Sequence, residues 1–84
     1  HSAIKRAKRR GLLRNVAVAL GNTGGPAAIA PLAACLAGEP EALVRGHAAW
    51  ALGRLGARAE LRRARTTETD PYVQEEIELA LTAQ

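Results

Sequence analysis

Apolar residues recur every three or four positions along most of this chain, which is the spacing of helices that bury one face. Glycine and proline clusters interrupt the pattern at residues 21–26, 38–40, 56 and 66–71. Between the interruptions the pattern predicts helices at about residues 3–20, 26–37, 41–55, 57–65 and 70–82. We therefore expect an all-α fold of about five helices.

Two prolines sharpen the expected helix ends. Asp70 followed by Pro71 is a favourable N-cap with proline at the first helical position, so it predicts the start of the last helix. Pro31 is less easily placed. Either it kinks the helix expected from residue 26, or it lies in the first turn of a helix that begins later.

The helices repeat along the sequence. Residues 44–52 align with residues 73–81 at an offset of 29 and with residues 12–20 at an offset of 32. A period near 30 residues that contains two helices is typical of an α-solenoid. The chain is thus predicted to be one domain, residues 1–84, with a leading helix at 3–20 and helix pairs at about 26–55 and 57–82. With so few repeats, we expect a cap or fragment that stacks on another part of a larger protein.

The repeat unit has a recognisable sequence. It begins with Ala28-Ile29-x-Pro31-Leu32 and continues through residues 44–56 (VRGHAAWALGRLG), and Asp70-Pro71-x-Val73 begins the next unit. This pattern resembles a HEAT-like repeat over most of residues 26–81. The resemblance implies a short HEAT-like α-solenoid and says little about function, since such repeats serve many partners.

The composition supports close helix packing. The chain has no Phe, no Met, one Trp and one Tyr, and its apolar residues are mostly Ala, Leu, Val and Ile. Its single cysteine, Cys35, cannot form an internal disulfide and is expected to be a small buried apolar residue. No apolar run reaches the roughly 20 residues that a membrane span needs. We therefore expect a soluble, cytoplasmic protein without a membrane partner.

Charge is distributed unevenly. The first 14 residues contain no acid and six bases, namely Lys5, Arg6, Lys8, Arg9, Arg10 and Arg14. Residues 66–84 contain five acids and no base. Arg6, Arg10 and Arg14 recur every fourth position, so they repel one another along one helix face unless something outside the helix compensates them. The candidates are RNA phosphates, an acidic protein surface and solvent.

A second candidate surface lies on the third predicted helix. His47, Trp50 and Arg54 share a face opposite the expected core positions Val44 and Ala48. Trp and Arg are favoured interface anchors, and Trp can stack on a base. Trp50 could equally pack against the neighbouring repeat. The sequence contains no catalytic triad, phosphate loop or metal-ligand spacing, so we expect no enzymatic activity from this chain alone.

Three blocks together suggest a more specific relationship. They are residues 2–6 (SAIKR), residues 8–22 (KRRGLLRNVAVALGN) and residues 47–53 (HAAWALG). In this order and spacing they are similar to the C-terminal domain of the epoxyqueuosine reductases, and the similarity covers nearly the whole chain.

This resemblance implies a parent oxidoreductase of queuosine biosynthesis that uses cobalamin and two [4Fe–4S] clusters to reduce epoxyqueuosine in tRNA. The cluster cysteines would lie upstream, and this chain would hold no cofactor. The implied partners are a tRNA anticodon stem-loop and the upstream catalytic domains of the same polypeptide. The candidate contact residues are Lys5, Arg6, Lys8, Arg9, Arg10, Arg14, Asn15, Asn22, His47, Trp50 and Arg54. The alternative is a HEAT-like protein-interaction module with no RNA role.

Overall fold

A computed structural model of the protein describes the backbone of residues 2–82 and the side chains of residues 11 and 13–82. Residues 2–82 form five α-helices: α1 (Ser2–Thr23), α2 (Ile29–Gly38), α3 (Ala42–Arg54), α4 (Arg58–Arg65) and α5 (Pro71–Thr82). A short 3-10 helix, Pro26–Ala28, precedes α2. The prediction of an all-α fold with about five helices is confirmed.

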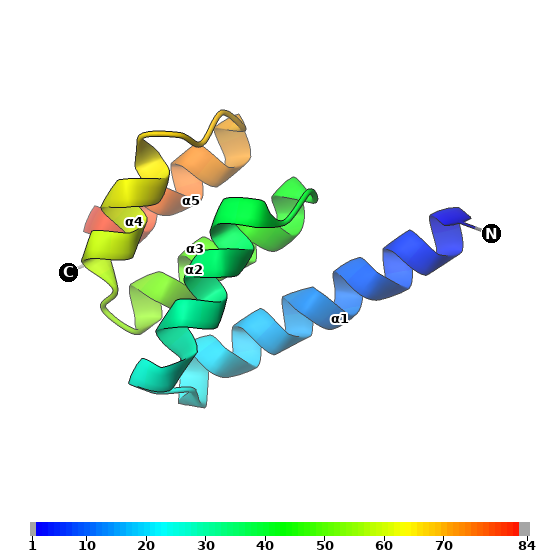
Figure 1. The fold of residues 1–84 in the computed structure, drawn as a ribbon, viewed down its shortest axis with the longest axis horizontal. Helices are drawn as coiled ribbons and strands as arrows, with labels where there is room; N and C mark the ends of the chain where they lie inside the picture. Colours follow the sequence, from blue (N-terminus) through cyan, green and yellow to red (C-terminus); the bar gives the residue numbers. More distant parts are fainter. Residues whose placement is uncertain (1, 83–84) are drawn as a thin grey trace.

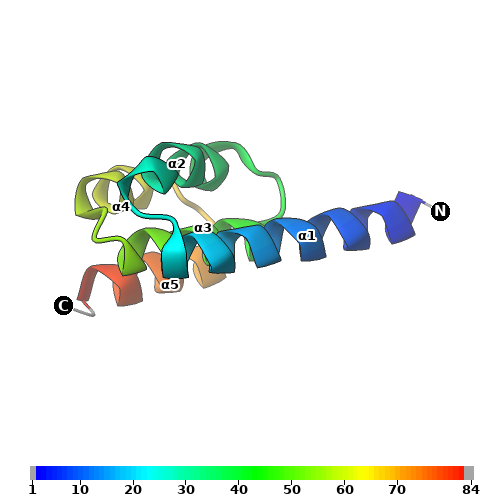
Figure 2. The ribbon, with the colours of Figure 1, turned by 90° about the horizontal axis from the view of Figure 1, so that it is seen from below.

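The helices form two layers. Helices α1, α3 and α5 lie side by side in one layer, and α2 and α4 cover it from one side (Figures 1 and 2). Helix α3 is central, because it packs against each of the other four α-helices. The N-terminal half of α1 projects beyond the rest of the molecule in both views (Figures 1 and 2).

The core is built mainly from small and branched aliphatic side chains. Val44 and Leu52 of α3, Leu61 of α4 and Val73 and Ile77 of α5 are completely buried. Ala48, Ala49 and Ala51 of α3 are also buried, so much of the surface that this helix presents to its neighbours is made of small side chains. Helices can therefore approach α3 from several sides at once.

Glycines bring the helices of the three-helix layer into contact. A Cβ atom on Gly21 of α1 would lie 2.8 Å from Cζ3 of Trp50 and 2.9 Å from Cα of Ala51. A Cβ atom on Gly53 of α3 would lie 2.7 Å from Cβ of Ala80 in α5. The expectation that the first helix ends at residue 20 is therefore wrong. Helix α1 continues through Gly21 to Thr23, because packing against α3 outweighs the weak helix propensity of glycine.

Helix ends follow the local sequence. Oδ1 of Asp70 accepts hydrogen bonds from the backbone N–H groups of Tyr72 (2.9 Å) and Val73 (3.3 Å), which confirms the predicted N-cap of α5. Pro31 lies in the first turn of α2, so it does not kink a helix that begins at residue 26 but stands at the start of a helix that begins later. The expected start at residue 26 corresponds to the 3-10 helix. Gly25, with φ 67°, makes the preceding turn in a conformation that favours glycine.

Candidate docking surface

The outer side of the three-helix layer brings two of the predicted site residues together. His47 and Trp50 point from α3 into a surface hollow of about 310 Å³. Val18 of α1 and Tyr72 and Glu76 of α5 complete its lining, together with Gly46. The only tryptophan and the only tyrosine of the chain thus lie in one place.

Trp50 has a structural role as well as an exposed edge. Its side chain is half-buried and packs against the hydrophobic core, and its ring edge fits into the space left by Gly21. The guanidinium carbon of Arg54 lies 5.8 Å from the centre of the Trp50 ring, within the range of a cation–π contact. The two alternatives left by the sequence are therefore compatible, since Trp50 packs against α1 and also lines the hollow.

Tyr72 forms the α5 side of the hollow by lying across Gly46. A Cβ atom at position 46 would collide with the tyrosine ring, at 2.7 Å from Cζ and 2.8 Å from Oη. Burial raises the pKa of the Tyr72 phenol, and the negative charges of Glu76 and Asp70 raise it further. The phenol therefore stays protonated, and the surroundings of the ring are electronegative.

His47 presents a hydrogen-bond acceptor. Its Nδ1 atom lies 2.8 Å from the carbonyl oxygen of Leu43 one turn earlier in α3. A carbonyl oxygen only accepts hydrogen bonds, so Nδ1 carries the proton. In the neutral ring, Nε2 then keeps its lone pair and is available to a donor.

The α1 side of the surface is polar and basic. Arg14, Asn15 and Asn22 are exposed. They lie three or four residues from Val18, which places them on the same side of α1 as the hollow. The side chains of Lys5, Arg6, Lys8, Arg9 and Arg10 lie outside the described residues. The predicted basic stripe is therefore located by the structure at Arg14 alone.

Charge changes sign across the layer. Arg14 lies at the α1 edge and Arg54 near the end of α3, whereas α5 carries Glu75, Glu76 and Glu78. A polyanion would therefore be attracted to the α1 side and repelled from the α5 side.

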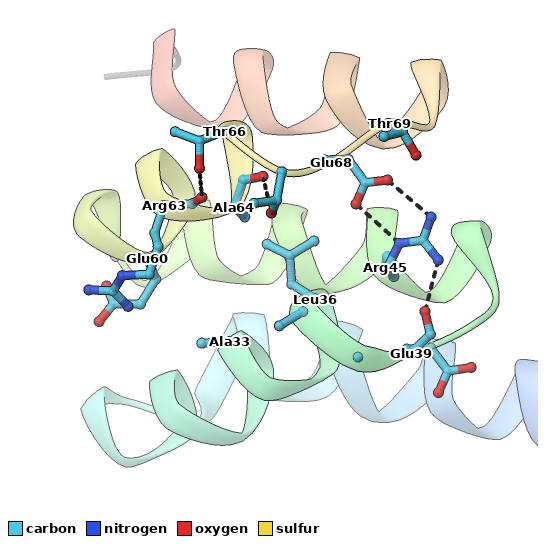
Figure 3. A pocket seen from close by; sticks show the side chains of 13 residues that line it. Ala33, Leu36, Glu39, Arg45, Glu60, Arg63, Ala64, Thr66, Glu68 and Thr69 are labelled. Carbon is cyan, nitrogen blue, oxygen red and sulfur yellow. Dashed lines mark hydrogen bonds and ion pairs between the residues drawn. The ribbon is translucent and has the colours of Figure 1, made fainter.

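A larger groove, of about 520 Å³, lies on the opposite layer between the C-terminal parts of α2 and α4. Figure 3 shows Arg45 at one end of it, between Glu68 and the backbone at Glu39. Its Nε and Nη2 atoms donate to Oε1 (3.1 Å) and Oε2 (3.0 Å) of Glu68, and Nη1 donates to the carbonyl oxygens of Glu39 (2.8 Å) and Pro40 (3.1 Å). Arg45 and Glu68, charged groups at this end of the groove, are thus engaged in contacts that stabilise the fold.

The electrostatics of Glu68 agree with a structural role. Burial alone would raise the pKa of its carboxyl group. This effect is outweighed by hydrogen bonds that the carboxylate accepts from Arg45 and from the backbone N–H groups of Asp70 and Thr69, and by the positive charge of Arg45. The pKa of Glu68 is therefore below its ordinary value. The hydrogen bonds that Arg45 donates to Glu68 also raise the pKa of Arg45. The pair stays ionised at neutral pH.

A family model described as HEAT repeats matches residues 2–82. The chain belongs to the HEAT-repeat family. No curated protein and no solved structure gives a significant match.

HEAT repeats are non-catalytic helical modules, which is consistent with the expectation that this chain alone is not an enzyme. Within the part of the chain that the structure describes, no three His, Cys, Asp or Glu side chains gather in a way that could hold a metal ion. In the same part, no helix has both the length and the apolar character needed to cross a membrane.

Sequence reasoning missed Tyr72, Glu76, Val18 and Gly46 in this HEAT-repeat surface. One observation could have indicated the first of them. A chain with a single tyrosine places it two residues after the Asp70 N-cap, at the start of a helix that runs beside α3. A large ring there needs a small neighbour. Gly46 lies within α3 and does not have a positive φ, so the backbone does not require a glycine at this position.

Proposed function

We propose that this HEAT-repeat chain is the tRNA-contacting and domain-docking segment of an epoxyqueuosine reductase-like oxidoreductase. One observation supports this most strongly. The sequence blocks that carry the resemblance, residues 8–22 and 47–53, are far apart in sequence, yet they pack together at Gly21, Trp50 and Ala51. The outer side of that contact is the candidate docking surface.

In this proposal the RNA contacts the α1 side, which the charge distribution favours. Phosphates bind where Arg14 and the basic residues before it are concentrated, with Asn15 and Asn22 as neutral hydrogen-bonding groups. The acidic helix α5 excludes the RNA backbone from the other side. The α5 side is then left for the upstream domains of the same polypeptide. Cobalamin and the iron–sulfur clusters belong to those upstream domains in this proposal.

The test is fluorescence anisotropy of a labelled tRNA anticodon stem-loop, titrated with the 84-residue chain at several salt concentrations. We expect the logarithm of the affinity to fall linearly with the logarithm of salt concentration, with a slope close to the number of phosphates neutralised. The double substitution Arg10→Glu and Arg14→Glu should weaken binding strongly and reduce the salt slope by about 2, or 1 per lost phosphate contact.

The matched control is Arg62→Glu with Arg63→Glu on α4. It changes the net charge by the same amount, but these exposed side chains belong to the other layer. Equal weakening by the two double variants would mean that only net charge matters and would contradict the assignment to α1. Absence of binding even at low salt would contradict the RNA role and leave a HEAT-repeat module that binds protein alone.

A further inference from the structure

We infer that the hollow between His47, Trp50, Tyr72 and Glu76 binds the guanidinium group of an arginine side chain from a protein partner. This inference deepens the domain-docking part of the proposed function by naming the chemistry of the partner, and its test uses no RNA.

The hollow consists of electron-rich groups. The faces of the Trp50 and Tyr72 rings carry negative charge density, Glu76 contributes a carboxylate, and Nε2 of His47 is an acceptor in the neutral ring. Such a set of groups suits a planar cation with several N–H donors. An arginine side chain can stack on an aromatic ring and donate hydrogen bonds from its edge at the same time, whereas an ammonium group cannot stack.

The molecule already contains one example of this contact. Arg54 places its guanidinium carbon 5.8 Å from the centre of the Trp50 ring, although Arg54 does not line the hollow. Among the described residues, the hollow is lined by Val18, Gly46, His47, Trp50, Tyr72 and Glu76, and none of these is an arginine or a lysine. An incoming arginine would therefore supply the missing charge.

Size and charge also distinguish an arginine from a nucleotide. A volume of about 310 Å³ is at the small end of ligand pockets and suits one side-chain head group or one base. A base would bring its phosphate close to Glu76 and Asp70, whose charges already act on Tyr72. That repulsion favours a cation over a nucleotide at this position.

The glycine at position 46 makes the geometry possible. Tyr72 can approach α3 this closely only because position 46 has no side chain, and this brings the partly exposed ring to the same hollow as His47 and Trp50. The hollow is thus formed by helices α1, α3 and α5 in the folded chain, and a partner finds its walls already in place.

The experiment is a titration of the ¹⁵N-labelled 84-residue chain with N-acetyl-argininamide, followed by ¹H–¹⁵N correlation spectra. We expect saturable shifts confined to Gly46, His47, the Trp50 indole, Tyr72 and Glu76. The neutral analogue N-acetyl-citrullinamide should produce no saturable shift. The substitution Glu76→Gln should weaken arginine binding by about tenfold, because a hydrogen bond to a charged group is lost.

The matched control is Glu75→Gln, which removes the same charge from the adjacent, exposed position outside the hollow. It should leave the affinity nearly unchanged. The inference is overturned if arginine gives no saturable shift, if the citrulline analogue binds equally well, or if Glu75→Gln and Glu76→Gln weaken binding to the same extent. It is also overturned if adenosine monophosphate shifts the same signals with higher affinity than the arginine ligand. None of these outcomes bears on the salt-dependent RNA titration, so the two proposals can fail independently.

Discussion

Arg45 connects the start of α3 to the segment that leads into it and to the segment between α4 and α5. From the first turn of α3 its guanidinium reaches the carboxylate of Glu68, 23 residues later, and the backbone that leads out of α2. Glu68 in turn accepts a hydrogen bond from the backbone N–H of Asp70, which caps α5. One ion pair therefore fixes the position of α5 relative to α2 and α3. The Glu68 side chain is only 7% exposed and Arg45 17% exposed, so solvent screens the pair less than a surface pair.

Replacing Glu68 by Gln should therefore reduce stability in a pH-dependent way. At neutral pH we expect the free energy of unfolding to fall by roughly 1.5–3 kcal/mol, the usual range for hydrogen bonds to charged groups. Because the pKa of Glu68 is lowered by folding, its contribution is present above the ordinary glutamate pKa and is lost as the pH falls through the lower, folded-state pKa. The difference between the two proteins should thus shrink as the pH falls below the ordinary glutamate pKa of 4.5 and approaches the lower, folded-state pKa.

Urea unfolding at several pH values would measure this difference. The control is Glu75→Gln, an exposed carboxylate on α5. A difference between wild type and Glu68→Gln that stays constant at every acid pH at which the chain still folds would show that the charge of the Glu68 carboxylate does not stabilise the fold.

Gly46→Ala tests the contact between α3 and Tyr72. In an open helix this change would stabilise the chain by up to about 1 kcal/mol. Here the new methyl group collides with the tyrosine ring, so we expect a net destabilisation of about 1–3 kcal/mol and displacement of Tyr72. Guanidinium unfolding would measure the change in stability. In a Tyr72→Leu background the same substitution should cost much less, and an equal cost in both backgrounds would mean that the ring is not the obstacle.

At the scale of whole elements, apolar spacing predicted which segments are helical, but packing determined where two of them begin and end. Leu32 and Leu36 repeat at helical spacing and are buried as expected, whereas the start of α2 is shifted by Pro31. Helix α1 extends past the glycine that was expected to end it, because that glycine is a contact point for α3. A periodic pattern defines a face, and it does not specify how closely a neighbouring helix approaches that face.

Two glycines in the same helix test this explanation. Gly11→Ala and Gly21→Ala are the same chemical change in α1, the first near its middle and the second in its last turn. A Cβ atom on Gly11 meets nothing within 4 Å, so Gly11→Ala should stabilise the chain by up to about 1 kcal/mol. Gly21→Ala places a Cβ atom 2.9 Å from backbone at Ala51 and should destabilise it by about 1–3 kcal/mol.

Thermal unfolding followed by circular dichroism would compare the two variants. The emission of Trp50, the only tryptophan, should shift to longer wavelength in Gly21→Ala as α1 moves away from α3. Changes of the same sign in both variants would contradict the role of Gly21 as a contact point.

At the scale of the whole molecule, the contacts that sequence reasoning missed all join α3 to later segments of the chain. The pairing of Tyr72 with Gly46 and of Arg45 with Glu68 depends on how α4 and α5 fold back beside α3, and no local pattern reports that register. The predicted residues His47 and Trp50 were found because they share one helix face, which periodicity does reveal. Their function, like that of Arg14, Asn15, Asn22 and Arg54, stays a prediction until a partner is bound.

The central position of α3 implies that the described repeats unfold together. The radius of gyration, 12.1 Å, is close to the roughly 12 Å expected for a compact domain of this length, and α3 packs against all four other helices. No helix pair therefore has a core of its own.

Ile77→Ala on α5 tests this, because it removes a completely buried side chain and should destabilise the chain by about 2–5 kcal/mol. Although Trp50 reports mainly on the contact between α1 and α3, its fluorescence transition should move to lower denaturant together with the circular dichroism transition. Leu79→Ala in the same helix is the matched control, since Leu79 is 55% exposed and its loss should move neither transition appreciably. If Ile77→Ala moved the circular dichroism transition and left the Trp50 transition in place, the α4–α5 pair would be a separate folding unit, and the central position of α3 would not make the repeats unfold together.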